Sequence, residues 1–310
     1  MIVKRNLSVR AVLRYTARPL AWATAWAVAA PLAYELSGEE RLLLPFAPVA
    51  ALAAALAIVI AFRNNAAFAR WNEARAAWQA VLVAGRSLAR QIITATADAA
   101  AAGTVTAAEA DRTARELVLR LAAFPRLLAG GVRPPVDWAR VEALVPPGEA
   151  AGLRAAAVPA TLLLQRQSAG IREAIRAGAL GPFDPISMEP PLAALATAQG
   201  TVERIARTPT PRQYAYFTRR FVQLLAAVTP FAVLPLVPDA VWWTIPLSLL
   251  VSGVFIVLDV TGSANDEPFA GAVTDVPIAA LCAEAESDLR EQLGEAALPP
   301  LPEPVAGYLW

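Results

Sequence analysis

Apolar residues gather into four runs that are close to the length needed to cross a bilayer. The runs cover residues 19–34, 42–62, 221–238 and 240–258, and none of them contains a charged side chain. A helix rises about 1.5 Å per residue and needs about 20 apolar residues to cross. The second and fourth runs suffice, whereas the first and third need their flanking turns. The pattern predicts an all-α membrane protein with four transmembrane helices in two hairpins.

The first run does not have the features of a cleaved signal peptide. Trp22 and Trp26 interrupt it, no A-x-A site precedes Glu35, and a second span follows at once. A signal peptide has a continuous apolar core followed by a cleavage site with small residues. We therefore expect the first span to stay in the mature protein.

Basic residues near the spans predict the orientation, because Lys and Arg are retained on the cytoplasmic side. The basic residues that flank the spans on one side are Lys4, Arg5, Arg10, Arg14, Arg18, Arg63, Arg70, Arg75, Arg212, Arg219 and Arg220. The two hairpin connections hold instead Glu35, Glu39, Glu40, Arg41 and Asp239. Both termini and the long middle region are thus expected in the cytoplasm, with Trp242 and Trp243 anchored at the opposite interface.

Between residues 63 and 215 the pattern changes to helices with a single apolar stripe. Over 107–129 the stripe consists of Leu117, Leu121, Phe124 and Leu128. Thr106 and Glu109 fit a capping box at the start of this helix, and Gly130-Gly131 is expected to end it. Further helices are expected near 137–144, 159–178 and 190–206, separated by proline and glycine clusters.

These patterns divide the chain into five parts. They are an N-terminal arm (1–18), a first hairpin (19–62), a cytoplasmic helical domain (63–215), a second hairpin (216–260) and a C-terminal segment (261–310). The last part contains the amphipathic stretch VPIAALCAEAESDLRE, followed by the proline-rich LPPLPEPV. Because proline cannot continue a helix, this tail is expected to be extended against another surface or disordered.

Composition supports the membrane interpretation and excludes several functions. Hydrophobic residues make up 57% of the 310 residues and charged residues only 17%, against roughly 25% charged in soluble domains. The net charge of +1 and the absence of basic-aromatic patterns give no support for nucleic acid binding. Histidine is absent and Cys282 is the one cysteine, which removes Cys/His zinc sites and His-based catalytic dyads or triads. We expect no cofactor, no metal and no enzyme activity, and Cys282 packed in its helix.

The second span continues without a break into a polar segment, so one helix is expected from about 46 to 95. Ala54, Ile58 and Phe62 lie on one face of it at spacings of four residues. A narrow ring of apolar side chains can close a pore by dewetting, and such a ring requires several copies of the chain. The same residues could instead pack against other helices or face lipid, which periodicity alone does not separate.

Three blocks carry a resemblance to a known family. The block FRNNAAFARWNEAR, followed by RSLARQ, resembles the signature of the bacterial branch of the bestrophin family. RTPTPRQYAYFTRRF at 207–221 is similar to the stretch before that family's third span, and NDEPFA at 265–270 resembles its motif after the last span. The likeness covers nearly the whole chain in the right order.

The resemblance implies a homopentameric ion channel in a bacterial inner membrane, with one axial pore. Counted from Arg70-Trp71, the hydrophobic neck positions fall on Ala54, Ile58 and Phe62, where Ala54 departs from the large aliphatic residue usual in the family. A second aperture at the cytoplasmic end should lie in FDPISMEPP, before the helix of 190–206. Ile186 is the first choice for it, and Met188 is the second.

The resemblance also bears on gating and on the permeating ion. Eukaryotic relatives bind calcium through acidic residues after the Pro-Phe-Gly motif, whereas here only Asp275 remains beside Asn265, Asp266 and Glu267. No calcium gating is therefore expected. Bacterial members are associated with cations and eukaryotic members with chloride, so monovalent cations are expected, with a chloride channel as the alternative.

The expected partners are further copies of the chain in a homopentamer, membrane lipid and permeating monovalent ions. Arg63, Arg70 and Arg75 are expected to pair with Glu73 and other acids, or to meet lipid phosphates, rather than line the pore. The rival hypothesis is a membrane-tethered regulatory or binding protein that conducts no ions. A secondary transporter is less favoured, because the spans lack internal repeats and mid-membrane ionisable groups.

Overall fold

The computed structural model describes residues 1–4 and 9–309 and is helical throughout these ranges apart from connections and isolated bridges. The longer helices are α1 (Val9–Ser37), α2 (Phe46–Ala101), α3 (Ala107–Val132), α6 (Pro159–Arg176), α7 (Asp184–Arg207), α8 (Arg212–Val233), α9 (Thr244–Asn265) and α10 (Ile278–Gln292). The shorter elements are η1 (Glu40–Leu42), α4 (Trp138–Glu142), α5 (Glu149–Ala155), η2 (Leu234–Leu236) and η3 (Val241–Trp243). The isolated bridges join Tyr308 to Ile2 and to Val305.

The chain folds into two compact units. The first, here called the span unit, comprises Lys4–Trp71 and Pro209–Glu267. The second, here called the polar unit, comprises Met1–Val3, Asn72–Thr208 and Pro268–Trp310. Helix α2 contributes its N-terminal part to the span unit and the remainder to the polar unit.

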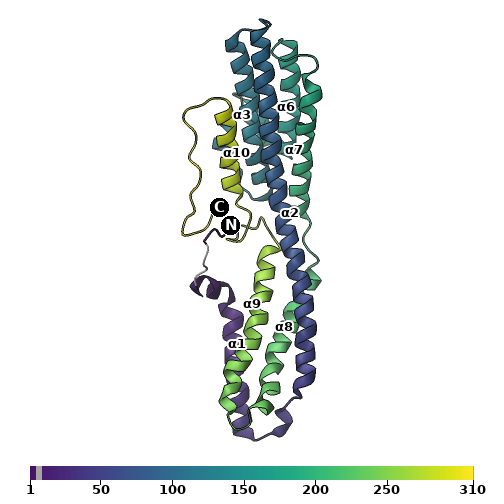
Figure 1. Ribbon diagram of the computed structural model, residues 1–310, viewed down its shortest axis with the longest axis vertical. Coiled ribbons are helices and arrows are strands. Elements are labelled where there is room, and N and C mark those ends of the chain that lie inside the picture. Colours follow the sequence, from purple (N-terminus) through teal and green to yellow (C-terminus); the bar gives the residue numbers. More distant parts are fainter. Residues whose placement is uncertain (5–8, 310) are drawn as a thin grey trace. The chain divides into compact units, whose positions relative to one another are not determined.

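The span unit consists of α1, α8, α9 and the N-terminal part of α2, which lie side by side (Figure 1). Their shared core is small and is formed by Ala23, Leu56, Ile60, Val222, Leu225 and Ile256. Among the described residues, three segments are long and apolar enough to cross a membrane, namely Glu40–Ala101, Arg212–Leu236 and Val241–Asn265. Helix α1 is not one of these three, so the first predicted span stays a prediction.

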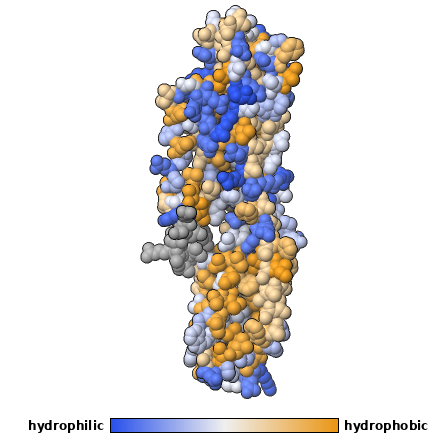
Figure 2. Space-filling view, viewed as in Figure 1, coloured by the Kyte–Doolittle hydropathy of each residue, from blue (hydrophilic) through white to orange (hydrophobic). Residues whose placement is uncertain are grey.

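The buried positions of helix α9 are mostly small or polar residues, and several of its large apolar residues are exposed. Its buried positions are Thr244, Ser248, Ser252, Ile256, Asp259 and Gly262. Leu250, Val254 and Leu258 of the same helix are exposed, and apolar side chains cover much of the visible face of the span unit (Figure 2). A helix in lipid gains nothing by hiding leucine, and close helix contacts there use small residues. The span unit is therefore organised as a membrane protein is.

The ends of the third and fourth predicted spans differ from the structure. Helix α8 begins nine residues before Phe221, and it ends at Val233 rather than at Pro238. Prolines at 235 and 238 follow that end, and proline cannot continue a helix. Helix α9 continues to Asn265 instead of ending at Leu258, and it thereby takes in Asp259. The charge-free runs and the helices therefore overlap without sharing their ends.

The polar unit buries large apolar side chains in the manner of a soluble domain. Helix α3 packs against α6 and α10, and Figure 1 shows α3, α6, α7 and α10 beside one another. The predicted stripe of Leu117, Leu121, Phe124 and Leu128 is buried, and so are Trp78 and Leu82 of α2. The capping box of Thr106 and Glu109 is confirmed, with the Glu109 N–H donating to Thr106 Oγ1 at 3.2 Å.

Two expectations for the helices of the polar unit are wrong. Helix α3 continues through Gly130-Gly131 to Val132, because Gly130 is needed for close packing: a Cβ there would overlap Val136. Helix α7 begins at Asp184 rather than at 190, since Pro185 lies in its first turn, where the missing N–H costs nothing. The short helix α5 was not expected after the VPPGE cluster.

The single cysteine and the tail agree with the sequence analysis. Cys282 is buried in α10, and burial raises the pKa of its thiol to about 12. Residues 298–304 have no regular secondary structure and are mostly exposed. Beyond them, the Val3 N–H donates to the Gly307 carbonyl at 3.0 Å.

A fully buried carboxylate holds three helices of the polar unit together. Glu286 of α10 is 0% exposed and accepts hydrogen bonds from Arg126 of α3, Arg140 of α4 and Arg290 of α10. Burial raises the pKa of this carboxyl, but the hydrogen bonds from Arg140, Arg290 and Arg126 outweigh burial and leave the pKa below its ordinary value. The folded protein therefore favours the ionised carboxylate of Glu286.

Replacing this carboxylate should destabilise the polar unit. Glu286→Gln leaves three guanidinium groups without their shared anion, and breaking a buried pair costs about 3–5 kcal/mol. Because the pKa is depressed on folding, the carboxylate stabilises the fold above about pH 4.3 and stops doing so as pH falls through the folded value. We expect a lower melting temperature for E286Q at pH 7, with the gap narrowing in acid. Equal melting temperatures at pH 7 would contradict the assignment.

Candidate functional site

The face of α2 that carries Ala54, Ile58 and Phe62 is not covered by the rest of the span unit. Ile58 is 59% exposed and Phe62 is 72% exposed, and Ala54 is exposed as well. Leu56 and Ile60, on the other side of the same helix, are buried in the core against α1, α8 and α9. The structure thus places the three predicted neck residues together on an exposed apolar strip.

An ion pair fixes α2 against α9 at the residue that follows Phe62. The Arg63 guanidinium pairs with the Asp259 carboxylate through Nη1, while its Nη2 donates to the Asp259 carbonyl at 2.7 Å and to Ser263 Oγ at 2.8 Å. Both side chains are almost fully buried. Arg219 Nε of α8 lies 3.8 Å from the other carboxylate oxygen. The charge beside the exposed strip is therefore directed into the unit and is neutralised there.

Two further contacts tie α2 to α9 beyond this pair. Asn64 Nδ2 donates to the Leu258 carbonyl at 3.1 Å, and its other side-chain atoms lie directly against Gly262, where a Cβ would overlap them. Arg70 Nε donates to the Asp266 carbonyl at 2.9 Å. Burial raises the pKa of the Asp266 carboxyl, which Arg63 and Arg70 partly offset. The α2–α9 contact therefore extends over about two turns of α2, from Arg63 to Arg70.

The partners of these arginines were only partly anticipated. Glu73 pairs with Arg204 of α7, and Arg63 takes Asp259 instead. Asp259 was not predicted as a partner because the fourth charge-free run ends one residue earlier. The signal was present, since Asp259 and Arg63 each follow an apolar run directly. Lone charges at such edges need a partner.

The structure separates the two residues expected at the aperture. Ile186 is 72% exposed in the first turns of α7, whereas Met188 is 1% exposed. This turn is set by Asp184, whose carboxylate accepts the Gly181 N–H at 2.6 Å. From Asp184 onward this stretch is helical, so Ile186 and Met188, two positions apart, point in different directions.

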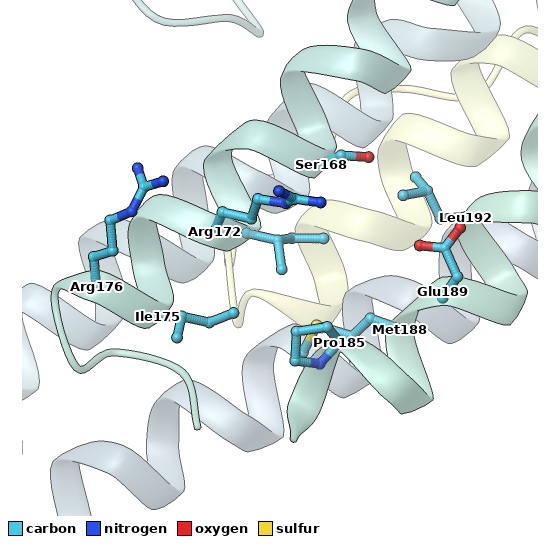
Figure 3. A pocket seen from close by; sticks show the side chains of 9 residues that line it. Ser168, Arg172, Ile175, Arg176, Pro185, Met188, Glu189 and Leu192 are labelled. Atoms are coloured by element: carbon cyan, nitrogen blue, oxygen red, sulfur yellow. The ribbon is translucent and has the colours of Figure 1, made fainter. Parts of the chain in front are cut away.

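Two cavities in the polar unit flank the start of α7, and Met188 lines both. One, of about 600 Å³, lies between α6 and α7, with Ser168, Arg172 and Arg176 on one wall and Glu189 and Leu192 on the other (Figure 3). The second, of about 720 Å³, is lined by residues of α2 and of the connection before α7. Met188 therefore acts as a packing residue between them.

The acidic residues after α9 do not gather into a metal site. Within residues 1–4 and 9–309, no three acidic, histidine or cysteine side chains are placed to hold a metal ion. The Asp275 carboxylate already accepts the Gly271 N–H at 2.6 Å and pairs with Arg133 at 2.9 Å. Burial raises the pKa of the Asp275 carboxyl, which these partners partly offset.

Comparison with known proteins identifies the family. The model of the bacterial/fungal bestrophin proteins matches residues 6–291 of this chain. The chain belongs to the bestrophin family. This bestrophin is 31% identical over 253 residues to the voltage-dependent anion channel-forming protein YneE of Escherichia coli (strain K12). The matched residues cover 82% of this chain and 78% of that protein. A relative of the same name from Salmonella typhi is also 31% identical, over 255 residues.

Solved structures share the fold of this bestrophin. A crystal structure of a bacterial bestrophin homolog from Klebsiella pneumoniae has a TM-score of 0.77 and 29% sequence identity, covering 90% of this chain and 98% of that chain. Another crystal structure, described as that of a membrane protein, has a TM-score of 0.79 with 29% identity and the same coverage.

The contact at Gly262 can be tested against a matched glycine in the same helix. Gly262→Ala puts a methyl group onto Asn64 and should force α2 away from α9, at a cost of about 1–3 kcal/mol. Gly253→Ala is the control, because its Cβ would meet only Leu20 Cδ2, at 3.9 Å, and alanine favours a helix by up to about 1 kcal/mol. We expect the melting temperature in detergent to be lower for G262A than for the wild type. For G253A we expect no decrease. Indistinguishable melting temperatures would contradict the close contact.

Proposed function

We propose that this bestrophin is one subunit of an ion channel that conducts monovalent ions. The uncovered apolar strip of Ala54, Ile58 and Phe62 carries the proposal, because it is the face that a ring of copies would turn toward a shared axis. The names of the Escherichia coli and Salmonella relatives, which describe channel-forming proteins, support the same function.

We further propose that the subunits form a homopentamer in the bacterial inner membrane, with α1 as a fourth span and both termini in the cytoplasm. In support, Trp22 and Trp26 of α1 are exposed on the span unit, and Trp26 Nε1 donates to the Ala227 carbonyl of α8 at 2.8 Å. Helix α1 is thus joined to a neighbour that is apolar enough to cross.

The proposed neck closes the pore by excluding water. Ile58 and Phe62 are large and lack polar atoms, so a ring of each would not hold a continuous water column when narrow. Ala54 is smaller and would leave the outer end of the neck wider. Arg63, the next charged residue, is held by Asp259, so its charge does not enter the strip.

A reversal potential can decide whether the permeating ion is an anion or a cation. The resemblance to bacterial bestrophins predicts cation permeation. The Escherichia coli and Salmonella relatives are named anion channel-forming proteins, however, and these names favour chloride. Across a potassium chloride gradient, a reversal potential near that of chloride would establish anion permeation, and one near that of potassium would establish cation permeation. We propose no calcium requirement, since Arg133 and Gly271 already occupy the carboxylate of Asp275.

Shortening the neck side chains should increase flux without destabilising the protein. Ile58→Ala and Phe62→Ala remove the bulk that excludes water, while exposed side chains contribute little to stability, within about 0.5 kcal/mol. We expect ion flux from reconstituted liposomes to rise in the double variant, with an unchanged melting temperature and the oligomeric mass of a pentamer.

Leu250→Ala is the matched control for this experiment, because Leu250 is an equally exposed apolar residue on α9. Its flux should equal that of the wild type. A rise in both variants would point to general loosening of the helices. A monomer without flux in any form would overturn the channel and favour a tethered module.

We propose Ile186, rather than Met188, as the aperture residue. Ile186→Ala should change conductance with little effect on stability, because the side chain is exposed. Met188→Ala should instead lower the melting temperature, since truncating a buried methionine costs about 2–5 kcal/mol. Single-channel recordings and thermal unfolding of both variants separate the roles. If I186A leaves conductance unchanged, the aperture lies elsewhere.

A further inference from the structure

A cavity of about 620 Å³ opens on the span unit between α1, α8 and α9. Its charged and polar lining consists of Arg18, Arg219, Gln223, Asp259 and Ser263. Its apolar lining includes Trp22, Val222, Ala226 and Ile256. The proposed neck uses none of these side chains. The cavity therefore calls for an occupant of its own, one with an anionic end and an apolar end.

The charged residues of this cavity lie at one level of the spans. Arg18 directly precedes the first charge-free run, Arg219 lies two residues before the third, and Asp259 directly follows the fourth. Helices α1 and α9 contact each other, as do α8 and α9, so these edges meet in the folded unit. The edge of an apolar run is where phospholipid headgroups lie in a bilayer.

The cavity has an excess of positive charge. Asp259 is the acid in the lining, and Arg63 already neutralises it through the ion pair. Arg219 lies 3.8 Å from Asp259 and is otherwise largely exposed, and Arg18 is exposed. The amide oxygen of Gln223 accepts from Arg220 at 3.0 Å, so its NH₂ group remains as a donor. Guanidinium forks and amide donors suit a phosphate.

The apolar wall of the cavity begins one turn from the arginines. Trp22 lies one turn beyond Arg18 on α1, and Ala226 lies two turns beyond Arg219 on α8. Trp22 is 46% exposed and stacks on Trp26 along the outer side of α1. A free phosphate would use only the rim of such a cavity. A phospholipid would use the rim for its headgroup and the wall for an acyl chain.

We propose that this cavity binds an anionic phospholipid, with the phosphate held by Arg18 and Arg219 and one acyl chain along Trp22 and Ala226. The site lies away from the exposed strip of α2. No residue of α2 lines the cavity, so the binding measurement does not require that the neck conducts.

Native mass spectrometry of the purified protein tests the proposal. Phosphatidylglycerol and phosphatidylcholine with identical acyl chains are compared as probes, because only the first carries net negative charge. We expect wild-type protein to retain phosphatidylglycerol preferentially. Arg18→Gln and Arg219→Gln should each weaken that binding about fivefold. Arg212→Gln, an exposed arginine at the start of α8 outside the cavity, should leave it unchanged.

A second measurement places the acyl chain and does not depend on the arginine variants. Phosphatidylglycerol with brominated chains should quench tryptophan fluorescence, and Trp22→Phe should remove part of that quenching. Glycerophosphate, which has no acyl chains, should fail to displace the lipid. Quenching that Trp22→Phe leaves intact would mean that no acyl chain lies along Trp22, which overturns the proposal. Equal binding of both lipids, equal loss in R212Q, or displacement by glycerophosphate would overturn it as well.

Discussion

The buried pair of Arg63 and Asp259 is the interaction on which the arrangement of the span unit depends. Two charges among apolar helices are stable only when they meet, because neither can be left unpaired in a medium of low dielectric constant. Their meeting sets the rotation of α2 against α9. That rotation turns Leu56 and Ile60 inward and leaves Ile58 and Phe62 uncovered. The same pair leaves a net positive charge in the cavity beside α8.

Several features were predictable because they arise within a few turns of the chain. The apolar runs, the long helix α2 and the Thr106–Glu109 capping box all follow from local spacing. The start of α7 and the role of Gly130 were not predictable from the sequence, because each depends on what the segment packs against. The partner of Arg63 lies 196 residues away in the chain, and no local pattern reports such a distance.

The two units bury opposite kinds of side chain. The exposure of an apolar side chain therefore could not be predicted from its hydropathy and had to be taken from the structure. In the polar unit, water outside drives large apolar residues such as Trp78 and Phe124 inward. In the span unit, serine, threonine and glycine of α9 lie inside and leucine lies outside. Hydropathy alone therefore does not separate Met188, which is enclosed, from the more hydrophobic Ile186, which is exposed.

Because Cys282 is buried, thiol reagents should leave the native chain unmodified. It is the one cysteine in 310 residues. With a pKa of about 12, only on the order of one thiol in 10⁵ is ionised at neutral pH, and the thiolate is the reactive form. Maleimide or methanethiosulfonate reagents should therefore modify only a cysteine introduced elsewhere. Accessibility scanning along α2 can then proceed without first removing the native residue.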